Sequence, residues 1–220
     1  INEISGGLAS IEEIRNALID FKKSKKTIYS YSEVYTQKAY YLASVADKIY
    51  LNPAGLLEFK GFSSKVMFFK GALEKLAIEP EIIRVGSFKS AVEPYMLDHM
   101  SDSSKLQTAV LLNSIYQHFL NAIAKERKIS VAELNAMANE LKIQSAQDAL
   151  KYKMVDALKY KDEVLSMLVN TTNQKNIEDL SLVSISDYQK SNPIPVSTAT
   201  EKIAIIYAAG EIVSGDGNED

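Results

Sequence analysis

The first 170 positions alternate between stretches with apolar residues at helical spacing and short apolar runs. The helical spacing predicts helices over residues 10–21, 38–46, 65–77, 101–127, 131–141, 146–152 and 162–169. The short runs predict strands over residues 27–31, 48–52 and 81–85, and Pro53 is expected to end the second strand. Helices that alternate with short strands are typical of an α/β fold, here expected to contain a mixed sheet.

The first helix shows how the pattern assigns an apolar face. Its apolar positions Ile11, Ile14, Leu18 and Phe21 fall at helical spacing. Ser10 precedes them and has the hydroxyl of an N-cap residue. We therefore expect the helix to begin at Ser10 and to present these four side chains on one side.

The last fifty residues differ in character from the rest. Residues 170–201 are rich in Asn, Thr, Ser and Gln and contain Pro193 and Pro195, which is typical of a connector. Residues 202–207 (Lys-Ile-Ala-Ile-Ile-Tyr) form a continuous apolar run, as in a buried strand. The chain begins at Ile1 without a methionine, and we expect it to be an internal piece of a longer protein.

Composition narrows the classes of function. The 220 residues include 25 Lys and Arg against 28 Asp and Glu, and 46% are hydrophobic, as in an ordinary globular protein. Because the net charge is −3 and no basic stripe stands out, nucleic acid is not expected as a partner. The absence of cysteine excludes disulfides and thiol catalysis, and two histidines leave little for a metal site. No apolar stretch approaches the roughly 18 residues that would span a bilayer.

Two segments near the amino terminus could carry chemistry. Gly6-Gly7 lies between a strand-like segment and the first helix, where backbone N–H groups could bind an oxyanion, although a tight turn is the commoner use of two glycines. Residues 35–44 include paired tyrosines at a helix start that could face a ligand. Since the chain has 12 tyrosines, aromatic packing is the simpler interpretation of that pair.

A third segment, residues 84–94 (Arg-Val-Gly-Ser-Phe-Lys-Ser-Ala-Val-Glu-Pro), places Lys89 among small or apolar neighbours. Burial there would favour the neutral amine, which can act as a general base toward a serine hydroxyl. Two other interpretations stay open. Lys89 could be an ordinary loop lysine, or Glu93 could hold it in an ion pair, which would prevent it from acting as a base.

These segments resemble the signal peptide peptidase family SppA (protease IV), most closely the amino-terminal half of its long, two-halved form. The residues that carry the resemblance are 84–94 with Asp98, Met100 and Ser101, then 40–44, 47–53 and Gly61-Phe62. We expect residues 1–170 to form the amino-terminal domain without its first strands. Residues 171–201 would then be a connector, and residues 202–220 the opening strand of the carboxy-terminal half.

The resemblance implies a fold and an activity. The fold is the crotonase/Clp-protease-like spiral of ββα units with additional helices. The activity is that of a membrane-bound serine protease that degrades cleaved signal peptides with a Ser–Lys dyad and no cofactor. Its lysine corresponds to Lys89, and the serine would come from the carboxy-terminal half. A homo-oligomer, a tetramer by resemblance, is expected at the bacterial inner membrane, with an anchor outside these residues and the soluble part facing the periplasm.

One departure from the family pattern is decisive for this half. Single-unit members have their nucleophile in a Ser-Gly-Gly segment before an aromatic pair, whereas this chain has Gln37-Lys38-Ala39 before Tyr40-Tyr41. Because Gln37 has no hydroxyl, we expect half an active site and no peptidase activity from this chain alone. Two alternatives are a catalytically inert scaffold that assembles oligomers and an acyl-CoA enzyme of the crotonase class, for which no carboxylate base is evident.

Overall fold

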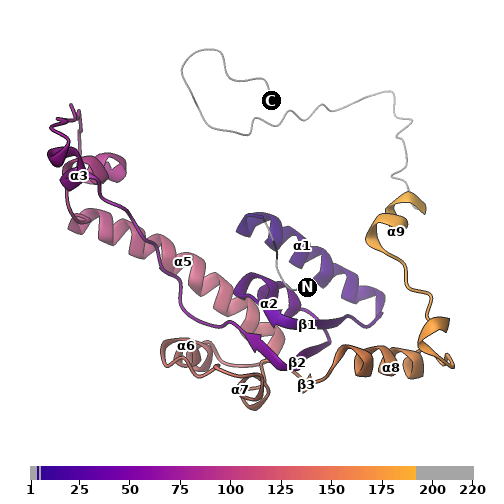
Figure 1. Cartoon of the computed structure of the whole chain (residues 1–220). Helices are drawn as coiled ribbons and strands as arrows, with labels where there is room; N and C mark the ends of the chain where they lie inside the picture. The colour runs from indigo at the N-terminus through magenta and orange to yellow at the C-terminus, as the bar shows by residue number, and fades with distance from the viewer. Residues whose placement is uncertain (1–3, 5, 192–220) are drawn as a thin grey trace. The chain divides into compact units, whose positions relative to one another are not determined.

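The computed structural model describes residues 4 and 6–191, and Figure 1 shows the order of the elements. Contacts divide the chain into two units, residues 1–180 and residues 181–220. The described elements of the first unit are α1 (Leu8–Phe21), η1 (Lys22–Ser24), β1 (Tyr29–Tyr35), α2 (Gln37–Ala43), β2 (Lys48–Leu57), α3 (Lys70–Lys75), η2 (Ser90–Val92), α4 (Glu93–Met96), α5 (Asp102–Arg127), α6 (Val131–Asn139), α7 (Ala146–Lys151), β3 (Ala157–Leu158), α8 (Lys161–Thr171) and η3 (Ile177–Asp179). The described part of the second unit contains α9 (Ile185–Ser191). The predicted strand at 202–207 lies outside the described residues.

The strands β1, β2 and β3 form one parallel sheet in that order. Parallel neighbours need a crossover, which α2 provides between β1 and β2, while α3 to α7 lie between β2 and β3 in the chain. The predicted α/β class is therefore confirmed. The prediction of a mixed sheet is not, because all pairs among the described strands are parallel.

The second strand continues past Pro53, contrary to the prediction. The pairing with β1 shifts between Ser32 and Val34, and Glu33 alone faces four residues of β2. Proline is tolerated at such a bulge because bulged residues need no ladder N–H. Gly55 is needed in the same bulge, since a Cβ there would lie 2.1 Å from the carbonyl oxygen of Glu33.

The buried face of α1 is rotated relative to the predicted one. Ile11 is buried as expected, but Ile14 and Phe21 are 49% and 45% exposed. Arg15 is buried instead, with 2% of its surface exposed. The sequence prediction placed only apolar residues on the buried face of α1, because charged side chains are rarely buried, and so it did not identify Arg15.

The guanidinium of Arg15 joins three helices. It donates to the Tyr41 carbonyl (2.5 Å) and the Ser44 hydroxyl (2.8 Å) at the end of α2, and to the Ala122 carbonyl of α5 (2.9 Å). It also lies over the Tyr41 ring, 4.7 Å from its centre. These contacts supply the hydrogen bonds that a buried charge requires.

The long helix α5 is anchored in the core by its second half only. The side chains of Tyr116, Phe119, Leu120 and Ile123 are buried, and Phe119 stacks on Tyr41 at 5.2 Å. Of residues 102–115, only Ser104 is buried. The predicted helix is confirmed: α5 begins after Ser101, whose hydroxyl accepts the backbone N–H of Ser104 as the N-cap. None of the described helices is long and apolar enough to cross a membrane.

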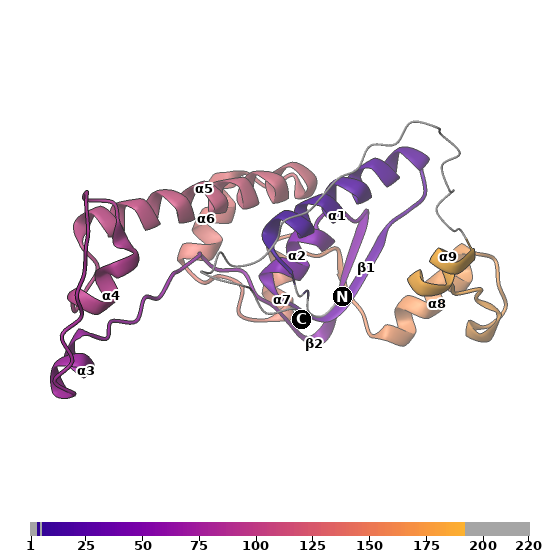
Figure 2. The same ribbon diagram turned by 90° about the horizontal axis from the view of Figure 1, so that it is seen from above.

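Residues 60–101, which we call the arm, connect β2 to α5. Figure 2 shows α3 and α4 beside the amino-terminal end of α5, away from the sheet. The helix predicted over 65–77 is reduced to α3, and the strand predicted over 81–85 is absent. An isolated apolar run cannot form a strand without a pairing partner, and Ile83 is 95% exposed.

Replacing Arg15 by alanine is expected to lower the free energy of unfolding by about 3 kcal/mol, because it leaves buried carbonyl and hydroxyl groups unpaired and opens a cavity. Urea denaturation measures the change. Asn16→Ala, on the exposed side of the same helix, is the matched control and is expected to change stability by less than about 0.5 kcal/mol. Equal effects of the two substitutions would contradict the role assigned to Arg15.

Candidate active site

Lys89 lies in the arm, at the residue that precedes η2. The loop that carries Lys89 runs from α3 to α4. Phe69, just before α3, contacts Pro94 and Tyr95 of α4. The backbone N–H of Phe69 donates to the Pro94 carbonyl at 2.7 Å, and the rings of Phe69 and Tyr95 stack with their centres 5.8 Å apart. The two ends of the segment that carries Lys89 are therefore held next to each other.

The carboxylate of Glu93 is almost completely buried in this otherwise exposed arm, with 2% of its side chain accessible. Ser101 donates its hydroxyl to Glu93 Oε1 at 2.6 Å and its backbone N–H to Oε2 at 3.1 Å. Arg84 Nη2 donates to Oε1 at 3.1 Å. We call Arg84, Glu93 and Ser101 the Glu93 cluster. Hydrogen bonds from Ser101, followed by the charge of Arg84, lower the pKa of Glu93 from its ordinary value.

Arg84 also binds the loop on the other side of Lys89. Its Nη2 donates to the Ser87 carbonyl at 2.8 Å, and its Nε donates to the Gly86 carbonyl at 3.3 Å. Gly86 has a φ of +95°, a conformation that favours glycine. The turn before Lys89 and the helical segment after it are thus held by one guanidinium.

Lys89 itself is exposed, and the residues described here give it no hydrogen bond or ion pair. The burial that would favour its neutral amine is therefore not provided by the described residues, because none of them covers the loop. Its apolar neighbour Phe88 is 55% exposed, and Val85 is 81% exposed. The alternative that Glu93 pairs with Lys89 is wrong, since the Glu93 carboxylate is occupied by Arg84 and Ser101.

The segment Gln37-Lys38-Ala39, which was expected to lack a nucleophile, makes structural contacts. Gln37 is the first residue of α2, and its Oε1 accepts the backbone N–H of Lys60 at 2.6 Å, where the arm begins. Lys38 Nζ donates to the Gly6 carbonyl at 3.1 Å, which places the Gly6-Gly7 turn beside this end of α2. Gly7 is the N-cap of α1, so the expected cap Ser10 lies inside the helix.

The paired tyrosines do not face a ligand. Tyr40 is fully buried, and its hydroxyl donates to the Met154 carbonyl at 2.7 Å. Tyr41 is 4% exposed and contacts Arg15 and Phe119. Burial raises the pKa of Tyr40, as expected for a packed phenol. The interpretation as aromatic packing is therefore confirmed.

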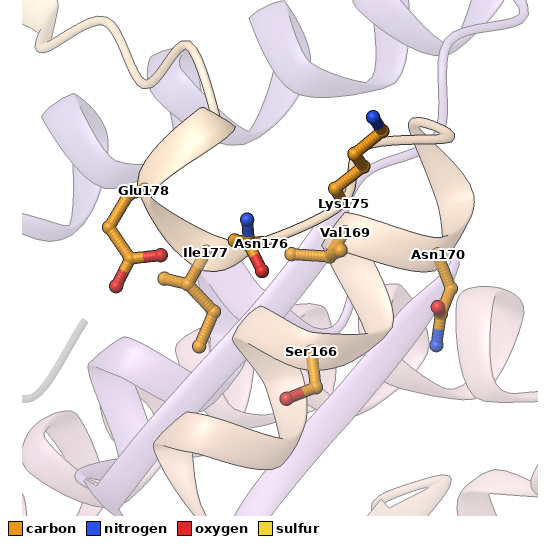
Figure 3. A pocket seen from close by; sticks show the side chains of 7 residues that line it. All are labelled: Ser166, Val169, Asn170, Lys175, Asn176, Ile177 and Glu178. Carbon is orange, nitrogen blue, oxygen red and sulfur yellow. The ribbon is translucent and has the colours of Figure 1, made fainter.

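A shallow hollow between α8 and η3 also contains a serine and a lysine (Figure 3). Ser166 lies on α8 and Lys175 on the loop that follows it. In Figure 3 the Ser166 hydroxyl and the Lys175 ammonium group point in opposite directions. These two residues therefore form no Ser–Lys pair, and the hollow offers no alternative site for the same chemistry.

The comparison of the sequence with known families decides the identity of the family. The sequence profile of Peptidase family S49 matches residues 20–175, a range that includes both Gln37 and Lys89. The chain belongs to this family. The resemblance based on residues 84–94 is thus confirmed, and so is the expectation of a protease family.

Individual relatives of this S49 chain agree. It is 33% identical to Protease 4 of Salmonella typhi over 94% of its length and 30% identical to Protease 4 of Haemophilus influenzae over 97%. It is 27% identical to the chloroplastic serine protease SPPA of Arabidopsis thaliana over 96%. The chain spans only 34%, 36% and 32% of these three relatives, about one third of their length.

The Glu93 cluster is the part of this S49 site that the sequence did not predict. Ser101 and Glu93 were expected only as parts of the family motif, and Glu93 also as a partner of Lys89, but no contact between the two was expected. The one signal in the sequence is a pair of opposite charges, Arg84 and Glu93, at the two ends of the segment that contains Lys89. That signal is weak, because charges at such spacing on a loop usually face solvent.

Because Glu93 is ionisable, we expect the stability of the arm's hydrogen bonds to Ser101 to depend on pH. Because the folded-state pKa of Glu93 is below the ordinary 4.5, its bonds to Ser101 stabilise the arm above that pH and weaken as the pH falls through and below it. We expect the hydrogen-exchange protection factors of the Ser101 and Ser104 amides to fall between pH 6 and pH 3. In Glu93→Gln the protection should be low at both pH values. Equal protection of the wild-type amides at both would contradict this assignment.

Proposed function

We propose that this chain supplies Lys89 as the general base of a Ser–Lys dyad whose serine lies outside residues 1–220. The whole protein would be a membrane-associated serine protease, oligomeric, that degrades signal peptides after their release. The observation that carries the proposal is that Lys89, in the segment that resembles the family's lysine motif, is exposed and has no hydrogen bond or ion pair with a described residue. By the same resemblance, Gln37 stands where a nucleophile would be, and its amide oxygen accepts the backbone N–H of Lys60.

The surroundings of Lys89 support a partner segment from elsewhere. Ile83, Val85 and Phe88 are 95%, 81% and 55% exposed on the same loop. Exposed apolar side chains in one place mark surfaces that are covered in an assembly. A covering segment would exclude water from the Lys89 amine and favour its neutral form, which a general base requires. The carboxy-terminal part of the same protein is the segment we propose.

The proposed reaction follows from these groups. Neutral Lys89 Nζ accepts the proton of the serine hydroxyl as the serine oxygen attacks the scissile carbonyl. Backbone N–H groups near that serine would stabilise the oxyanion, and the proton would pass from Lys89 to the leaving amine. An extended apolar peptide would bind by strand pairing, with its side chains in pockets, which suits signal peptides. This chain alone would lack the nucleophile and be inactive.

An inert scaffold is the second candidate. The exposure of Lys89 and the hydrogen-bonded Gln37 are compatible with a half that only supports an active carboxy-terminal part. The two candidates differ in one property, namely whether the activity of the whole protein depends on the Lys89 amine.

Lys89→Met in the full-length protein tests the proposal, because methionine keeps the approximate length of the side chain and removes the amine. We expect peptidase activity to fall at least about a hundredfold, the low end of the loss when a general base is removed. Lys75→Met, at an exposed lysine of α3 in the same arm, is the matched control and should leave activity unchanged. Unchanged activity of Lys89→Met would favour the scaffold.

A further inference from the structure

We infer that Arg84 and Glu93 are positioning residues for Lys89, an inference that rests on the proposed role of Lys89 as the base. A general base must be held within a fraction of an ångström of the group that it deprotonates, and a displacement of about 1 Å can cost about a hundredfold in rate. Lys89 lies on a loop of an exposed arm, so its position must be fixed by contacts other than core packing.

The Glu93 cluster provides those contacts on both sides of Lys89. Before it, Arg84 binds the Gly86 and Ser87 carbonyls at 3.3 and 2.8 Å. After it, the same guanidinium binds the Glu93 carboxylate at 3.1 Å. The backbone on either side of Lys89 is therefore tied to one rigid, planar group, which a flexible lysine ammonium could not replace.

The cluster also connects this loop to the core. Glu93 accepts both the hydroxyl and the backbone N–H of Ser101, the N-cap of α5. From there α5 continues without interruption to Phe119 and Ile123, which are buried in the core. The path from the core to Lys89 is thus one helix, one carboxylate and one guanidinium.

Helix capping alone does not account for this arrangement. In α6, Glu133 accepts the hydroxyl and backbone N–H of Ser130 at 2.7 and 3.0 Å, from three residues away. That capping box satisfies the same kind of helix terminus with local residues. Glu93 instead reaches Ser101 from eight residues away and also binds Arg84, so the cluster fixes the shape of the loop in addition to capping α5.

The test is a set of variants in the full-length protein, measured on a peptide substrate. Glu93→Gln and Arg84→Lys disrupt the hydrogen bonds of the Glu93 cluster. Glu133→Gln is the matched control, because it changes a capping carboxylate far from the arm in sequence. Each is made with Lys89 present and in the Lys89→Met background. Using two variants of the cluster keeps the test valid if one of them does not fold.

With Lys89 present, we expect Glu93→Gln and Arg84→Lys to lower kcat at least about tenfold with KM changed less than about twofold, and Glu133→Gln to change neither. In the Lys89→Met background, the two cluster variants should cause no further loss, because they act through the amine.

Two results would overturn the inference while leaving the role of Lys89 intact. One is a kcat within about twofold of wild type in both cluster variants when Lys89→Met is inactive. The other is an equal loss with and without Lys89, which would show a general structural effect. Full activity of Lys89→Met would instead contradict the proposed role of Lys89 as the base, and with it the inference that rests on that role.

Discussion

The described structure depends on how α5 is anchored, and the buried guanidinium of Arg15 is central to that anchor. Arg15 binds the end of α2 and the Ala122 carbonyl of α5, and Phe119 packs on the same Tyr41 ring that Arg15 covers. A buried charge with several hydrogen bonds tolerates few alternative arrangements, because any shift leaves a charge or a carbonyl unpaired. These contacts fix the position of the second half of α5. Because α5 is one continuous helix, they also fix the position and direction of its first half.

Two segments matter for the proposed function, namely the start of α2 at Gln37 and the loop of the arm that carries Lys89. At the start of α2, the amide oxygen of Gln37 accepts the backbone N–H of Lys60, where the arm begins. In the arm, the loop that carries Lys89 is exposed, whereas the side chain of Glu93 is 2% exposed and that of Arg84 is 18% exposed. In the proposed function, this half of the protein supplies the base, and the nucleophile lies outside residues 1–220.

The sequence predicted the helices over 101–127, 131–141 and 162–169 because apolar residues recur there at helical spacing. It failed where a tertiary contact overrides the local pattern. Arg15 was placed outside the core because its hydrogen-bond partners lie on other helices. Residues 81–85 have strand composition, but no strand among the described residues pairs with them. Pro53 is accommodated by the bulge that the register between β1 and β2 creates. The Lys89 motif could be predicted, whereas the Glu93 cluster could not, since its bonds span residues 84–101.

In the proposed function, Lys89 activates a serine that lies outside residues 1–220. The most direct measurement is labelling of the full-length protein with a fluorophosphonate, which reacts with activated serines, followed by mass spectrometry of the labelled peptide. We predict one labelled serine outside residues 1–220 and strongly reduced labelling in Lys89→Met. A labelled serine within residues 1–220, or labelling that is equally fast without the Lys89 amine, would contradict it.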